Sequence, residues 1–67
     1  MNKEQQVRLE TIAIMLGIGG YKGSSQTLQE RCRQVYNKLV MLERKEINAN
    51  QFAVTMLDSI EFCRNQM

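Results

Sequence analysis

Apolar residues recur at steps of three and four through most of the chain, and no stretch shows the alternation expected of a strand. This spacing predicts helices over about residues 2–16, 27–46 and 49–66, with a glycine-rich joint at 17–26. The connection between the last two helices is short, which favours an antiparallel hairpin. We therefore expect one all-α domain of three helices that dimerises as a helical bundle.

Residue types suited to helix ends stand at each of these boundaries. Asn2 and Thr27 each precede a Gln or Glu by three positions, which is the spacing of a capping box. Gly17 follows the first helix, where a left-handed backbone commonly ends a helix. Either Asn48 or Asn50 can cap the third helix.

The two long helices carry apolar stripes that can face each other in a coiled-coil-like seam. The first stripe consists of Leu28, Cys32, Val35, Leu39 and Leu42, widened by Tyr36 and Val40, and the second of Ala53, Met56, Ile60, Cys63 and Met67, widened by Phe52 and Leu57. Cys32 and Cys63 lie at similar distances from the connection. We expect them to be reduced, buried neighbours in one core layer.

The first helix has two apolar faces. One face carries Leu9, Ile12, Ala13 and Leu16, and the other carries Val7, Ile14 and Ile18. Two further helices can cover one face of a neighbour, so the second face predicts a partner, either another copy of this chain or a different protein. Alternatively, the first helix lies in a cleft between the other two and uses both faces there. A flexible joint would permit either arrangement.

Phe62 and Val54 lie well away from the stripe of the third helix, and Met41 lies away from the stripe of the second. Phe62 is therefore expected to be exposed. Together with the second face of the first helix, it would form a protein-binding patch of Val7, Ile14, Ile18 and Phe62.

Composition limits the class of protein. The chain has 67 residues, 43% of them hydrophobic, and two cysteines, so it forms one small domain. A core of this size is marginal, and self-association is the expected source of added stability. The N-terminus lacks the pattern of a secretion signal, and the run IAIMLGIGG is far shorter than the about 20 residues that span a bilayer. We expect a cytoplasmic protein with no membrane contact.

The joint and the basic residues raise the question of phosphate binding. A nucleotide-binding Walker loop places Gly-Lys before Ser or Thr, whereas the order here is Lys22-Gly23-Ser24. The glycines of the joint are expected to end the first helix, and its hydroxyls to cap the second. A weaker anion or nucleic-acid site remains open as the alternative, and its candidate contacts are Lys22, Ser24, Ser25, Arg31, Arg33 and Lys38. A net charge of +2 is low for a DNA-binding domain. For this reason, a small dimeric DNA-binding regulator is kept only as the alternative function.

The sequence contains no histidine, so neither cysteine has the usual base of a catalytic thiol. No spacing of residues indicates a metal or cofactor site, and we expect neither. The preferred hypothesis is a non-enzymatic protein-interaction module: an adaptor, inhibitor or regulatory subunit that binds a protein partner through helices.

Overall fold

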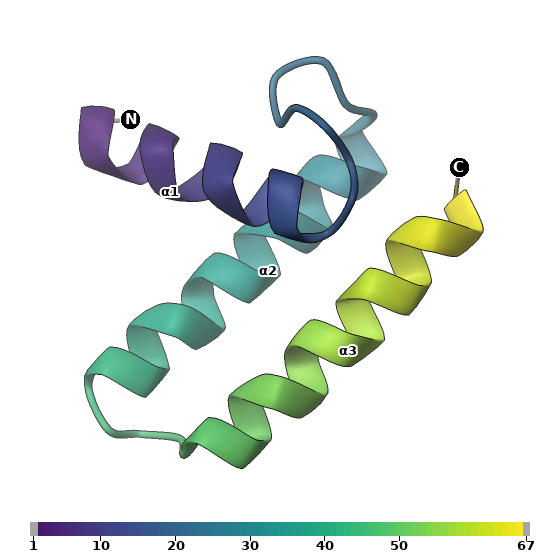
Figure 1. Ribbon diagram of the computed structural model, residues 1–67. Coiled ribbons are helices and arrows are strands. Elements are labelled where there is room, and N and C mark those ends of the chain that lie inside the picture. The colour runs from purple at the N-terminus through teal and green to yellow at the C-terminus, as the bar shows by residue number, and fades with distance from the viewer. Residues whose placement is uncertain (1, 67) are drawn as a thin grey trace.

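The computed structural model describes residues 2–66 of the chain and contains three helices. They are α1 (Lys3–Met15), α2 (Gln26–Glu43) and α3 (Ala49–Gln66). Helices α2 and α3 run antiparallel, side by side, and α1 lies across α2 (Figure 1). The all-α, three-helix fold is confirmed, and α1 folds back onto the hairpin.

Polar side chains begin each helix. The Asn2 side chain accepts a hydrogen bond from the Gln5 amide at 2.7 Å, as expected. Asn48 caps α3 in a complete capping box with Gln51. The Gln51 amide donates to Asn48 Oδ1 at 2.9 Å, and the Asn48 amide donates to Gln51 Oε1 at 2.9 Å. The cap predicted for α2 is wrong: Ser25, not Thr27, accepts the capping bond, and the helix starts at Gln26.

Helix α1 ends in a Schellman motif. Gly17 has φ +80°, the left-handed conformation in which glycine has no steric penalty. Beyond it, the Ile18 amide donates to the Ala13 carbonyl at 2.9 Å and the Gly17 amide donates to the Ile14 carbonyl at 3.0 Å. The turn redirects the chain toward the hairpin.

Helix α2 ends in the same motif but without a glycine. The Glu46 amide donates to the Met41 carbonyl at 2.8 Å, and Lys45 occupies the left-handed position with φ +63°. The helix therefore stops at Glu43, short of the predicted boundary at 46. A lysine in this conformation carries backbone strain that a glycine would not.

The core forms where α1 crosses the hairpin. Its buried apolar residues are Leu9, Ile12, Ala13, Leu16, Tyr21, Leu28, Cys32, Val35 and Cys63. The most deeply buried side chains are small: Ala13, Cys32, Val35, Cys63 and Ser59. Small side chains at the centre let the helices approach closely, while larger residues fill the rim.

The buried face of α3 is rotated from the predicted stripe. Ser59 is 1% exposed and faces the core, whereas Leu57 is 66% exposed and does not widen the seam as expected. Ala53 is also exposed, although it was predicted to be part of the stripe. Met67, the last predicted member of the stripe, lies outside the described residues.

Candidate protein-binding surface

The side of α1 that faces away from the hairpin carries the exposed apolar residues Val7 and Ile14, with the polar residues Glu10 and Thr11 between them. Val7 is 57% exposed and Ile14 is 65% exposed, and Met15 next to Ile14 is exposed as well. We call this surface the outer face of α1. A shallow hollow follows it, lined by Lys3, Gln6, Val7, Glu10, Thr11 and Ile14.

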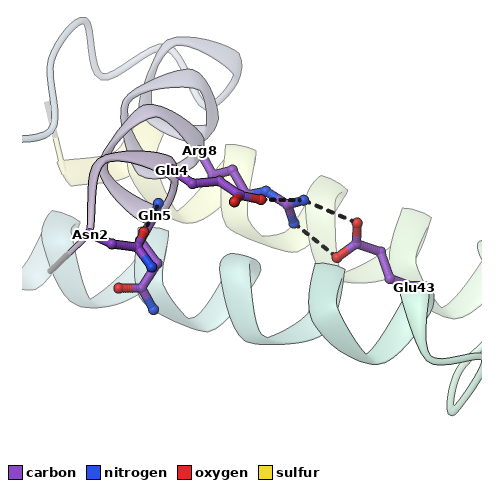
Figure 2. Close-up of polar contacts among 5 residues, drawn as sticks. All are labelled: Asn2, Glu4, Gln5, Arg8 and Glu43. Atoms are coloured by element: carbon purple, nitrogen blue, oxygen red, sulfur yellow. Dashed lines mark hydrogen bonds and ion pairs between the residues drawn. The ribbon is translucent and has the colours of Figure 1, made fainter.

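The opposite side of α1 is held by packing and by an ion pair. Leu9, Ile12 and Leu16 are buried against the hairpin, and each such side chain contributes about 1.5–3 kcal/mol of hydrophobic stabilisation. Arg8 extends from α1 to the carboxylate of Glu43, near the C-terminal end of α2 (Figure 2). These contacts fix which face of α1 remains open to solvent.

The Arg8–Glu43 pair is bidentate. Arg8 Nη1 donates to Glu43 Oε1 at 2.9 Å and Arg8 Nη2 donates to Glu43 Oε2 at 3.3 Å. Glu4, one helical turn before Arg8, joins the same guanidinium at 3.3 Å. The hydrogen bond from Arg8 holds the pKa of Glu43 below its ordinary value, and the same bond with Glu43 raises the pKa of Arg8.

The glycine-rich joint is tied to both helices that it connects. Tyr21 is buried, and its amide donates to Glu10 Oε1 at 2.6 Å. Its carbonyl accepts from Gln29 Nε2 at 2.9 Å, and its hydroxyl accepts from Arg33 Nη1 at 2.8 Å. Tyr21 therefore fastens the joint to α1 and α2 in the arrangement in which α1 folds back onto the hairpin.

Ile18 and Phe62 do not lie with the other residues of the predicted patch. Both pack against the core and are only partly exposed. The Schellman motif at Gly17 turns Ile18 back toward the hairpin, and burial of Ser59 brings Phe62 toward α2. Their predicted exposure is corrected, and Val7 and Ile14 remain as the exposed pair.

The hydroxyl groups of the joint serve local structure. The Ser24 hydroxyl donates to the Gly20 carbonyl, and the Ser25 hydroxyl accepts from the Leu28 amide at 3.3 Å. Lys22 is exposed between Tyr21 and these serines. The serine contacts account for both hydroxyls without an anion.

The basic residues of α2 are spread over different surroundings. The Arg31 guanidinium lies over the Phe62 ring, 4.1 Å from its centroid, in a cation–π contact between α2 and α3. Arg33 bonds to Tyr21, as described above, and Lys38 is exposed. Of the three α2 cations predicted to contact an anion, Arg31 and Arg33 therefore make contacts within the protein.

Cys32 and Cys63 are both buried and unpaired, as expected. Burial raises the pKa of Cys32 to about 11, and the neighbouring Cys63 contributes to this rise. Burial also raises the pKa of Cys63. Protonated, enclosed thiols are poor nucleophiles, so the pair is part of the core and not a reactive centre.

Within residues 2–66, no three Cys, Asp or Glu side chains come together as metal ligands. No helix in this range combines the length and apolar character needed to cross a bilayer. Comparisons of the chain with protein-family models, curated proteins and solved structures found no match.

Proposed function

We propose that the protein is a small protein-interaction module, acting as an adaptor, inhibitor or regulatory subunit, that binds through the outer face of α1. The observation that carries this proposal is the exposure of Val7 and Ile14 on a helix whose opposite face is buried. Water-exposed apolar residues on a well-anchored helix favour burial against another apolar helix.

A second copy of the chain is the partner that this face suits first. Val7 and Ile14 are seven positions apart, so they lie on one side of α1. When two such helices pair antiparallel, Val7 of each copy can lie opposite Ile14 of the other. A two-fold dimer of this kind buries the same patch on both subunits and enlarges a small core.

Sedimentation of the protein up to tens of micromolar tests this proposal. The unsubstituted protein should be dimeric, and the double variant Val7→Asp with Ile14→Asp should be a monomer that remains folded. The matched control is Val54→Asp with Leu57→Asp, which places the same charges on exposed apolar positions of α3. A control variant that also dissociates would show that charge alone disrupts the dimer.

A monomer at every concentration would refute the homodimer and leave the question of a different protein partner. Affinity capture from the native cell answers that question when the three proteins are compared. Proteins bound by the unsubstituted chain and by the α3 variant, but lost with the α1 variant, would support the outer face. Equal capture by all three would contradict its role.

A further inference from the structure

A second concave surface lies between α1 and α2, and it includes no residue of the outer face. It holds about 260 Å³ and is lined by Gln5, Leu9, Arg33, Tyr36 and Asn37. Ordinary ligand sites begin at about 300 Å³, so this hollow suits a small molecule.

The lining combines one cation with neutral hydrogen-bonding groups. Arg33 supplies a guanidinium, Gln5 and Asn37 supply side-chain amides, and Tyr36 supplies a hydroxyl. Neither Asp nor Glu lines the hollow. The arrangement therefore favours a negatively charged ligand.

Arg33 is held in place before any ligand arrives. Its Nη1 donates to the Tyr21 hydroxyl at 2.8 Å, and the backbone of Tyr21 is tied to Glu10 and Gln29. Glu10 Oε1 accepts from the Tyr21 amide, so this carboxylate binds the joint. A positioned guanidinium loses less freedom on binding, which favours affinity.

The rest of the lining is apolar. Leu9 is buried, and the ring of Tyr36 packs against the core. An inorganic phosphate would use Arg33 and the polar groups but would leave Leu9 and the Tyr36 ring uncovered, whereas a carboxylate on an apolar body uses both parts of the lining. We propose that this hollow binds a small organic carboxylate whose anionic group meets Arg33 and whose apolar body lies against Leu9 and Tyr36.

Titration of the ¹⁵N-labelled protein with benzoate at constant ionic strength tests the proposal. Benzoate should shift the amide signals of Gln5, Tyr36 and Asn37 in a saturable way. Benzamide has the same shape without the charge and should bind about tenfold more weakly or worse, because a hydrogen bond to a charged group is lost. Equal binding of benzoate and benzamide, or of benzoate and inorganic phosphate, would overturn the ligand class.

Two variants locate the site. Arg33→Gln should weaken benzoate binding about tenfold or more, while Lys38→Gln, which removes an exposed charge from the same helix, should leave it unchanged. Asn37→Leu removes an amide from the lining without touching Tyr21 and should weaken binding severalfold. Benzoate affinity that survives both Arg33→Gln and Asn37→Leu would refute the site.

Discussion

The guanidinium of Arg8 meets both carboxylate oxygens of Glu43, 35 positions further along the chain. This ion pair joins α1 to the C-terminal end of α2. The buried residues of α1, in contrast, lie in the middle and C-terminal part of α1. The pair therefore gives α1 a second point of attachment to the hairpin, away from its apolar contacts.

Glu43→Gln should lower the thermal midpoint at neutral pH. Since Arg8 holds the pKa of Glu43 below its ordinary value, the stabilisation is present above that ordinary value and is lost as pH falls through the lowered pKa. Thermal unfolding of both proteins from about pH 7 to about pH 2 measures this. The midpoints should converge in acid, and Glu46→Gln should show no such pH dependence. A gap that persists in acid would assign the effect to packing.

The two cysteines should react slowly with a thiol reagent such as DTNB while the protein is folded. Burial keeps both thiols protonated, with the pKa of Cys32 at about 11, and the thiolate is the reactive form. Lys38→Cys, which adds a thiol at an exposed position of α2, provides the internal reference. If Cys32 and Cys63 reacted as fast as this added thiol in the native protein, the core would be more open than the structure shows.

Ser25→Ala should destabilise the protein by about 1 kcal/mol, because an amide at the start of α2 loses its acceptor. For a domain of this size, that corresponds to about 4–8 °C in the thermal midpoint. Thr27→Ala is the matched control, since Thr27 is exposed within α2, and it should change stability by less than about 0.5 kcal/mol. The reverse ranking would restore Thr27 as the cap.

Gly17→Ala should destabilise the protein by about 1–2 kcal/mol in chemical denaturation. The added Cβ would meet no atom within 4 Å, so the whole effect comes from the backbone at φ +80°. Gly23→Ala is the control, because its Cβ is also unobstructed and its φ lies outside the left-handed region. That change should be neutral or slightly stabilising. Equal losses at both positions would contradict the backbone explanation.

Lys45→Gly should have the opposite sign and stabilise the protein by about 0.5–1 kcal/mol. Lys45 adopts φ +63° at the position where Gly17 stands in α1, and glycine removes the penalty of a left-handed lysine. The greater freedom of glycine in the unfolded chain offsets part of the gain. Arg44→Gly, at the preceding αR position, should destabilise the protein in the same denaturation experiment.

Local signals predicted much of the fold. Asn2, Asn48 and Gly17 act within one turn of their own positions, so their roles follow from neighbouring residues. The end of α2 could not be predicted in this way, because residues 43–46 are Glu, Arg, Lys and Glu, which are good helix formers. Thr27 had the spacing of a capping box, yet Ser25 caps the helix, and Gln29 bonds to the carbonyl of Tyr21 in the joint.

The surface was harder to predict than the core of α1. Ser59 is polar and was not counted as a core residue, so the buried face of α3 was placed too far from Phe62. The spacing of residues does not predict the Arg8–Glu43 ion pair or the hydrogen bonds of Tyr21, because these partners come together only when the helices pack. The exposed pair Val7 and Ile14 could be predicted, because a second apolar face on one helix is visible in the local spacing of residues alone.

Because the side chains at the centre of the core are small, the protein should tolerate smaller substitutions there better than larger ones. Trimming Ser59 or Cys63 to alanine would remove little volume, so the neighbouring helices would lose few contacts. Enlarging either residue would strain the packing, because both side chains are already enclosed by their neighbours. The positions at the crossing are therefore confined to small residues.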